Sequence, residues 1–574
     1  MASYDLVIRG GTIVDGTGGA LYDGDVAVVG GRIVAVGAAT GVGHEEIDAR
    51  GKLVTPGFVD IHTHYDGQVT WEHRLAPSSN HGVTTVVMGN CGVGFAPCRP
   101  GDQAMMIKLM EGVEDIPGVV MEEGVPWNWE TFPDYLDAIE QRHMDVDFAA
   151  QLPHSALRVY VMGERGANLA PPTADELDEM RRLTAEAISA GALGVSTSRT
   201  LVHRFPDGRS APSVGSEDEE LLALARGLRD AGAGVFQVVP NIHGSADEEF
   251  AIFRKIVEAS DRPLTFSLVN LSSERQNWLT FLKHLDEAGA AQEPISAQFI
   301  PRPAGFLFGL DLSTHPFCLN PSYRPIANLP LAEKVRIMRD PDFRARLITE
   351  EPDDPNPTAV QFATAPRQYF ELGDPPVYSQ PPENSVAAKA EALGISLREA
   401  LYDALMAQDG KAVLYAPSSN NVPVTIAEAR PMFERENAVM GLGDGGAHYG
   451  FISDATMPTY LLTDWVRDAK APQLDLPLAI KALTSEPAAV FGLHDRGTIK
   501  AGAKADLNVI DLDRLHLHAP SVVRDLPAGG RRIVQGSDGY VATIVSGVVT
   551  YREGIPSGAL PGRLIRGARQ AASI

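Results

Sequence analysis

The chain has 574 residues, of which 44% are hydrophobic and 21% are charged, so it can bury a large core. Its 55 glycines and 41 prolines are too few for a collagen-like or low-complexity chain. With 49 Lys and Arg against 74 Asp and Glu, the net charge of -25 disfavours nucleic acids and anionic membranes as partners.

Compartment is indicated by the cysteines and by the N-terminus. Three cysteines in so long a chain (Cys91, Cys98 and Cys318) are typical of a reducing compartment. The segment Met1 to Gly10 lacks the basic start, apolar run and cleavage site of a signal peptide, and no run of about 18 apolar residues follows. The sequence therefore predicts a cytoplasmic protein with no membrane partner.

In chain order, the pattern changes from antiparallel strands to alternating strands and helices. Residues 4–38 alternate apolar and polar positions between glycine turns, which predicts short antiparallel strands. Capping boxes at Thr173-x-x-Glu176 and Ser216-x-x-Glu219 predict helix starts. From residue 58 onwards strands and helices alternate, which indicates a parallel sheet. The expected units are strands 58–62, 83–88, 194–198, 234–239, 263–269, 294–299 and 438–443, with helices 217–231, 246–260 and 273–288.

These elements predict an α/β protein with two structural units. The interval of about 301–400 is rich in proline and has no clean period, so we expect an insertion there. After about residue 497 short strands return. The architecture expected is a (β/α)8 TIM-like barrel over 58–489, with a small β-sandwich built from both chain ends, 1–57 and 490–574.

The sharpest local motif is the pair His62 and His64, which follows an apolar strand and a Pro-Gly turn. Alternate residues of a strand point to the same face, so both imidazoles project to one side. Two histidines placed in this way can hold one metal ion. The alternative is that the pair is only a polar strand face, but its place at the start of the strand and helix alternation favours the metal.

Taken with six further motifs, this pair resembles the metal-dependent amidohydrolase superfamily, and within it the N-acyl-D-amino-acid deacylase (D-aminoacylase) branch. The motifs are IRGGTIVDG (8–16), PGFVDIHTH (56–64), GVTTVVMGNCG (82–92), GALGVSTS (191–198), GDGGAH (443–448), GTIKAGAKADL (497–507) and DLPAGG (525–530). The resemblance covers nearly the whole chain except 301–400.

The resemblance implies a metal site and a reaction. In this family two histidines, an aspartate after strand eight and a cysteine after strand two bind the metal, and these roles fall on His62, His64, Asp444 and Cys91. Such ligands suit Zn²⁺, and we expect one ion per chain. Asp444 could also take a proton from the attacking water. A small buried hydrophobe is the alternative role for Cys91.

The chain also departs from the family pattern. The family has histidines on strands five and six, and a lysine two residues after the second one receives the substrate carboxylate. Aligned by eye, Val239 and Leu268 take the histidine positions and Asn270 takes the lysine position. Aliphatic side chains cannot bind a metal. We therefore expect an apolar wall, a single metal and a bulky, less charged substrate. Asn270 is expected to bind this substrate and to mark altered specificity.

Other residues could replace the missing groups. The candidates in sequence terms are His154, His203, His243, Glu114 and His448. His154 is expected where a third strand ends, in a place to bind substrate, and a structural, hydrogen-bonded histidine is its alternative. His448 could contact the substrate or support the metal ligands. Glu114 is expected to be a solvated loop charge. An arginine could receive a substrate carboxylate through its bidentate geometry, the candidates being Arg199, Arg204 and Arg302.

One motif is set aside. Residues 441–446 satisfy the G-x-G-x-x-G spacing of a dinucleotide fingerprint, but the following sequence does not predict the βαβ unit that the fingerprint requires.

The leading hypothesis is a metal-dependent hydrolase of a small-molecule amide, in which a metal-activated water attacks the carbonyl. A second hypothesis is a non-catalytic amidohydrolase-fold scaffold that has lost its metal. A third keeps the metal but hydrolyses an ester, a lactone or another C–N bond such as that of a cyclic amide. A homo-oligomer is left open, as are the actual substrate and its stereochemistry.

Overall fold

The computed structural model describes residues 3–271, 274–365, 367–418, 426–469 and 473–567. Nine parallel strands, in two sheets, follow one another in chain order. The first sheet contains β6 (Phe58–Asp60), β7 (Val83–Met88) and β8 (Asp147–Ala150). The second contains β9 (Leu152–Pro153), β10 (Gly194–Ser198), β11 (Val235–Val239), β12 (Leu264–Ser267), β13 (Ile295–Phe299) and β17 (Ala438–Met440). Only Gln151 separates β8 from β9, so the two sheets are consecutive.

Helices connect these strands, as the alternation predicted. Those between β6 and β13 are α1 (Gln68–Trp71), α2 (Gln103–Glu114), α3 (Gly118–Gly124), α4 (Phe132–Glu140), α5 (His154–Met162), α6 (Glu164–Ala167), α7 (Ala174–Ala190), α8 (Asp218–Ala231), α9 (Ala246–Ser260) and α10 (Arg275–Ala290). Those flanking β17 are α16 (Ile426–Phe433), α17 (Met457–Tyr460), the π-helix η6 (Leu461–Arg467), α18 (Leu476–Leu483) and α19 (Ser485–Val490). None of the described helices is long and apolar enough to cross a bilayer.

One of the two predicted capping boxes is confirmed. The Thr173 side chain accepts a hydrogen bond from the backbone N–H of Glu176, and the Glu176 side chain accepts one from the backbone N–H of Thr173. Helix α7 begins at Ala174, directly after this cap. The box at Ser216 is wrong, because Glu217 is the N-cap of α8 and makes no side-chain capping bond. The start of α8 is instead favoured by three acidic residues in its first turn, which interact with the helix dipole.

Both chain ends contribute to one mixed sheet. Its order is β25 (Ile555–Pro556), β24 (Val548–Arg552), β23 (Tyr540–Val545), β18 (Leu507–Ile510), β5 (Leu53–Pro56), β1 (Ser3–Ile13), β2 (Tyr22–Val29) and β3 (Arg32–Gly37), with β4 (Val42–Asp48) paired to β1. The join is antiparallel, between β5 and β18. Because β5 ends two residues before β6 begins, this sheet fixes the start of the parallel strands.

Two short strand pairs extend the C-terminal part. They are β19 (His516–Leu517) with β22 (Ser537–Asp538), and β20 (Ser521–Val523) with β21 (Arg532–Val534).

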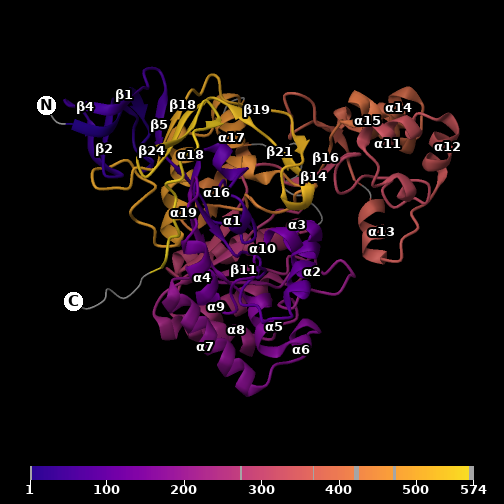
Figure 1. Cartoon of the computed structure of the whole chain (residues 1–574), viewed down its shortest axis with the longest axis horizontal. Coiled ribbons are helices and arrows are strands. Elements are labelled where there is room, and N and C mark those ends of the chain that lie inside the picture. Colours follow the sequence, from indigo (N-terminus) through magenta and orange to yellow (C-terminus); the bar gives the residue numbers. More distant parts are fainter. Residues whose placement is uncertain (1–2, 272–273, 366, 419–425, 470–472, 568–574) are drawn as a thin grey trace.

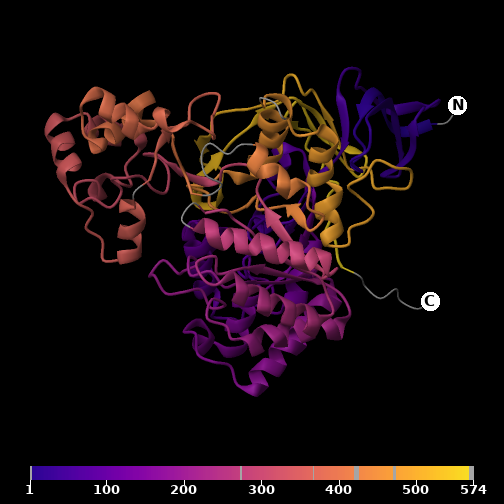
Figure 2. The same cartoon turned by 180° about the vertical axis from the view of Figure 1, so that it is seen from behind.

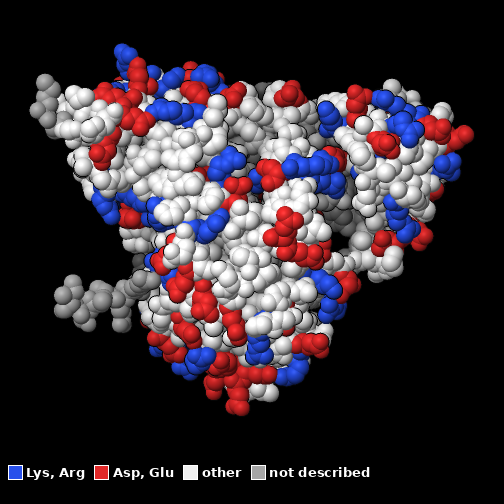
Figure 3. All heavy atoms as spheres, viewed as in Figure 1, with Lys and Arg blue, Asp and Glu red and all other residues white. Residues whose placement is uncertain are grey.

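The proline-rich interval belongs to a separate lobe, residues 305–417, which projects from the side of the molecule (Figures 1 and 2). It contains β14 (Gly305–Phe308), α11 (Leu331–Met338), α12 (Pro341–Thr349), α13 (Pro357–Thr364), β15 (Phe370–Glu371), α14 (Val386–Leu393), α15 (Leu397–Gly410) and β16 (Leu414–Pro417). The lobe buries its own apolar cluster, from Phe308 to Ala416. On the face drawn in Figure 3, acidic side chains gather over α7 and α8, at the lower end of the molecule in that view.

Candidate metal centre

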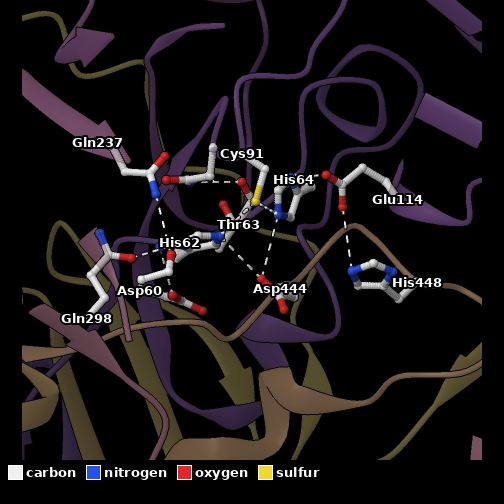
Figure 4. A network of polar contacts seen from close by, with 12 residues as sticks. Asp60, His62, Thr63, His64, Cys91, Glu114, Gln237, Gln298, Asp444 and His448 are labelled. Atoms are coloured by element: carbon white, nitrogen blue, oxygen red, sulfur yellow. Dashed lines mark hydrogen bonds and ion pairs between the residues drawn. The ribbon is translucent and has the colours of Figure 1, made fainter. Parts of the chain in front are cut away.

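Four side chains converge on one point beyond the carboxyl ends of the parallel strands (Figure 4). His62 Nε2 lies 3.3 Å from Cys91 Sγ and 3.5 Å from Asp444 Oδ1. His64 Nε2 lies 3.9 Å from Cys91 Sγ and 3.6 Å from Asp444 Oδ1. Two imidazole nitrogens, a thiol and a carboxylate are a donor set that suits Zn²⁺.

Backbone pairing brings these side chains together. Strand β6 ends at Asp60, two residues earlier than predicted, so both histidines follow the strand. The segment that follows is tied to β7, because Thr63 donates both its backbone N–H and its hydroxyl to the carbonyl of Val87 in that strand. The His62 carbonyl accepts a bond from the backbone N–H of Asp444, which follows β17. With these bonds in place, both imidazole Nε2 atoms face Cys91 and Asp444.

Glycines allow the segment after β17 to approach the one after β6. A Cβ on Gly443 would lie 2.0 Å from the carboxylate of Asp60, and one on Gly446 would lie 2.8 Å from the carbonyl carbon of His64. Gly446 also has φ +89°. Close backbone approach therefore accounts for the glycine spacing of residues 441–446 without a nucleotide.

Several residues of the centre adopt the left-handed backbone conformation. Cys91, Asp444 and His448 have φ of 57°, 49° and 52°. This conformation costs L-residues about 1–2 kcal/mol each, and such strain concentrates at functional sites.

A shell of polar residues orients the two histidines. Gln298, on β13, places its Oε1 2.7 Å from His62 Nδ1, so this nitrogen donates and Nε2 is left facing the centre. Glu114, the last residue of α2, is 1% exposed, and its two oxygens lie 3.3 Å from His64 Nδ1 and 3.6 Å from His448 Nε2. The prediction that Glu114 is a solvated loop charge is therefore wrong.

Burial is the largest influence on the ionisable groups of the centre. It lowers the pKa of His62 to about 4. Burial raises the pKa of Asp444, but its contact with His64 and the nearby imidazole charges outweigh burial and keep it well below its usual value. Burial lowers the pKa of His64, yet the charges of Glu114 and Cys91 raise it well above its usual range. A proton on His64 thus offsets the nearby negative charge, and a divalent cation can replace that proton.

Burial is also the largest influence on the pKa of the Cys91 thiol. Burial raises its pKa to about 12. A metal ion reverses this effect, because a coordinating thiol is deprotonated.

The centre opens into a pocket of about 240 Å³. The described residues that line it are His62, His64, Cys91, Glu114, His203, Val239, Ser267, Val269, Ile300, Ala304, Gly305, Phe306, Ser418, Leu442, Asp444, His448, Ile452 and Asp454. Of the expected replacements, this pocket therefore includes Glu114, His203 and His448. Val239 forms part of its wall, as predicted.

Leu268 does not line this pocket, contrary to prediction. It is 3% exposed and packs in the core, while its neighbours Ser267 and Val269 face the pocket. Adjacent residues of an extended chain point to opposite faces, so an alignment error of one position reverses the side. Asn270, which was assigned to substrate binding, lies outside the described lining.

His154 lies away from the metal centre and has a structural role. It is the first residue of α5, where its ring nitrogens lie 2.8 Å from Thr197 Oγ1 and 2.9 Å from Glu220 Oε1. Glu220 also pairs with the buried guanidinium of Arg158. The expectation that His154 binds substrate is therefore wrong, and its alternative, the hydrogen-bonded histidine, describes it.

The three arginine candidates are engaged elsewhere. Arg302 is 1% exposed, forms an ion pair with Asp454 and lies over the ring of Tyr378. It supports the wall through Asp454 and does not line the pocket, which contradicts its assignment to substrate binding. Arg199 pairs with Glu249.

The third arginine, Arg204, donates to the carbonyl of Gly208 and lies outside the described lining. His243, a candidate replacement for the missing histidines, is exposed beside Glu274 and also lies outside it.

We expect Glu220→Gln to destabilise the fold at neutral pH by about 3–5 kcal/mol, because it leaves the Arg158 guanidinium buried without its carboxylate. Burial raises the pKa of Glu220, but its bonds to His154 and Arg158 outweigh burial and lower it from 4.5 to about 2. A lowered pKa stabilises the folded state above the unfolded value, and this contribution is lost as the pH falls from about 4.5 towards 2. Thermal unfolding at pH 7 and pH 3 measures both effects.

The neighbouring Glu219 provides the control. Its side chain is 68% exposed and lies 3.6 Å from Arg226, so Glu219→Gln should change stability by less than about 0.5 kcal/mol. Equal stability of the two variants at pH 7 would contradict the buried network.

Sequence reasoning missed Gln298, and it named Glu114 among the candidates but predicted the wrong environment for it. For Glu114 a signal exists, because Ile107, Met110 and Glu114 share one helical face and α2 buries that face. For Gln298 the signal is weaker: it is a polar residue in an otherwise buried strand, near the carboxyl end where such sites assemble.

Comparison with known proteins places the chain in a family. The model of the amidohydrolase family matches residues 45–551. N-acyl-D-glutamate deacylase of Alcaligenes xylosoxydans xylosoxydans is 26% identical, over 98% of this chain and 96% of its own. D-aminoacylase of the same organism is 31% identical, over 53% of this chain and 58% of its own.

A solved structure supports the same fold. N-acyl-D-glutamate deacylase from Bordetella bronchiseptica, complexed with zinc and a phosphonate inhibitor, has a TM-score of 0.66 at 23% identity, covering 99% of this chain and all of that one. The chain therefore belongs to the amidohydrolase family and is a D-aminoacylase-like hydrolase of amide C–N bonds, as its sequence motifs predicted.

Proposed function

We propose that the chain binds one Zn²⁺ ion through His62, His64, Cys91 and Asp444 and uses it to hydrolyse a neutral, bulky N-acyl compound. The observation that carries this proposal is the convergence of four donor atoms, in which each imidazole Nε2 lies 3.3 to 3.9 Å from Cys91 Sγ and Asp444 Oδ1. Such a donor set argues against the alternative of a scaffold that has lost its metal.

When bound, zinc supplies a Lewis acid that polarises a carbonyl and lowers the pKa of water. The Asp444 carboxylate lies 3.5 and 3.6 Å from the two imidazole Nε2 atoms, so it is placed to accept a proton at this point. Gln298 fixes the tautomer of His62 through the 2.7 Å contact. His448 lines the pocket with its Nε2 3.6 Å from Glu114 Oε2, and from this place its ring can contact the substrate.

The pocket wall supports the substrate class. Val239, Val269, Ile300, Phe306 and Leu442 make it largely apolar. None of the described lining residues is a lysine or an arginine, whereas three are carboxylates. A substrate carboxylate would face this wall without a cationic partner, which costs free energy, and apolar groups gain about 25 cal/mol per Å² buried.

We also propose that the parallel strands form a closed (β/α)8 barrel over 58–489, interrupted by the insertion. The strand order supports this, as do two backbone bonds that link the segments after β17 and β6, from Asp444 to His62 and from His64 to Gly445. The shared sheet supports a second domain built from 1–57 and 490–574, for which we propose a β-sandwich.

The proposal is tested by metal analysis and substrate comparison on the same preparation. Protein purified without added metal should contain about one equivalent of zinc by mass spectrometry, and chelation should abolish hydrolysis. Neutral amides of N-acyl-D-amino acids should be better substrates than the corresponding free acids. Their L-enantiomers, assayed in parallel, determine the stereochemistry.

Three outcomes would contradict the proposal. They are well under half an equivalent of any transition metal together with indifference to chelators, two metals in the pocket, or faster turnover of the free acids. The second outcome has a precedent in D-aminoacylase, for which a binuclear metal centre with activation by one metal and attenuation by a second is described.

A further inference from the structure

A second cluster of metal-binding side chains lies outside the pocket, on the strand pair β19 and β22. His516 and His518 alternate along the chain at β19, and Asp538 is the cross-strand partner of His516. One nitrogen of each ring and a carboxylate oxygen all lie within 4.8 Å of one another. All three side chains are about half exposed.

Hydrogen bonding prepares this cluster for a cation. His516 Nδ1 lies 3.0 Å from the carbonyl oxygen of Arg514, so this nitrogen carries the hydrogen. In the neutral ring, Nε2 then presents a lone pair towards Asp538 Oδ2, 3.4 Å away. His518 Nε2 lies 3.2 Å from the other oxygen, Asp538 Oδ1. A carbonyl that fixes the outer ring nitrogen is the arrangement found around metal-binding histidines.

An ordinary ion pair explains this geometry less well. It would require protonated imidazoles, and two of them 5.3 Å apart would repel each other across a single carboxylate. A divalent cation placed among the three groups satisfies both lone pairs and the carboxylate together.

We propose that His516, His518 and Asp538 form a second, peripheral site for a divalent transition metal ion such as Zn²⁺. Imidazole and carboxylate ligands are those that zinc, nickel and copper share, and three protein ligands leave open positions for water. Exposure makes this site weaker than the buried centre. It is independent of the proposed catalytic ion.

The site would brace a part of the structure that reaches the pocket wall. The carbonyl of His518 accepts a bond from Gln535 Nε2, at 2.9 Å. Gln535 Oε1 in turn accepts bonds from Ser453 Oγ and from the Tyr378 hydroxyl of the lobe. Ser453 precedes Asp454, which lines the pocket. We therefore expect metal at this site to raise the melting temperature.

Equilibrium dialysis of the full-length holoenzyme against Zn²⁺, with metal quantified by mass spectrometry, tests the proposal. The wild type should bind two ions, a tight one and a weaker one. His518→Gln should weaken the second by more than about tenfold, because even the loss of an outer hydrogen-bond partner costs about 10–100-fold in metal affinity. Hydrolysis should be unchanged in this variant, and added Zn²⁺ should no longer raise its melting temperature.

Two further variants separate this proposal from the proposed function. His62→Ala should lose the tight ion and keep the weaker one. His243→Gln is the matched control, because its exposed ring lies 3.4 Å from one carboxylate, on Glu274, but has no second histidine in the described cluster; it should behave like the wild type. A wild type with no second equivalent, or a His518→Gln variant that retains it, overturns the peripheral site. Loss of the tight ion from the wild type contradicts the proposed function alone.

Discussion

Replacing Asp444 with asparagine should lower turnover by about 10²–10⁴-fold, the range for loss of a general base. The carboxylate lies 3.5 and 3.6 Å from the two imidazole Nε2 atoms, so it is placed both to bind the ion and to accept a proton. Asparagine keeps the side-chain volume and tolerates the left-handed backbone that Asp444 adopts, with φ 49°. Steady-state kinetics, with metal content and circular dichroism of the same sample, measures the effect.

A surface variant controls for the amide substitution itself. Asp286 pairs with Arg435, and its side chain is 56% exposed, so Asp286→Asn should retain full activity. An Asp444→Asn enzyme with more than about a tenth of wild-type turnover would remove Asp444 from the mechanism, since that loss falls below the range for a general base.

Much of the fold could be predicted because its elements have strong local signals. Strands 83–88 and 194–198 and helix 246–260 have the predicted bounds. The Ser216 box failed because an acidic first turn can begin a helix without a side-chain cap. The helices of the lobe, such as α11, were not predicted in the proline-rich interval, where tertiary packing of a separate apolar cluster outweighs the weak local pattern.

Some residues of the metal centre also have local sequence signals, and others do not. His62, His64 and Asp444 lie in glycine-rich motifs whose spacing is local, and the structure brings them together. Gln298 is 236 residues from His62 in the sequence, so its contact exists only through the order of the strands.

The prediction for Leu268 failed for a related reason. Alignment by eye has no register information, and one residue decides which face of a strand a side chain occupies. For Arg302, the sequence alone cannot show that its guanidinium already forms an ion pair with the buried side chain of Asp454.

The ligand role of His62 gives the other large expected effect. His62→Ala should abolish hydrolysis and weaken binding of the tight zinc by more than 100-fold, a larger loss than the about 10–100-fold typical of outer partners. Gln298→Ala should fall within that range, because it leaves the ligands in place and frees only the His62 ring, whose Nδ1 lies 2.7 Å from Gln298 Oε1. Competition with a chromogenic chelator measures both affinities.

The decisive result is which of the two variants loses more zinc affinity, because His62 is proposed to bind the ion and Gln298 only to orient His62. If His62 binds the ion directly, excess Zn²⁺ restores Gln298→Ala and leaves His62→Ala inactive. His243→Ala, which removes an exposed imidazole beside Glu274, controls for loss of a surface zinc contact and should match the wild type. Equal zinc affinity in His62→Ala and the wild type would show that the ion is held elsewhere in the pocket. His203 and His448, which also line it, would then be the first alternative ligands to test.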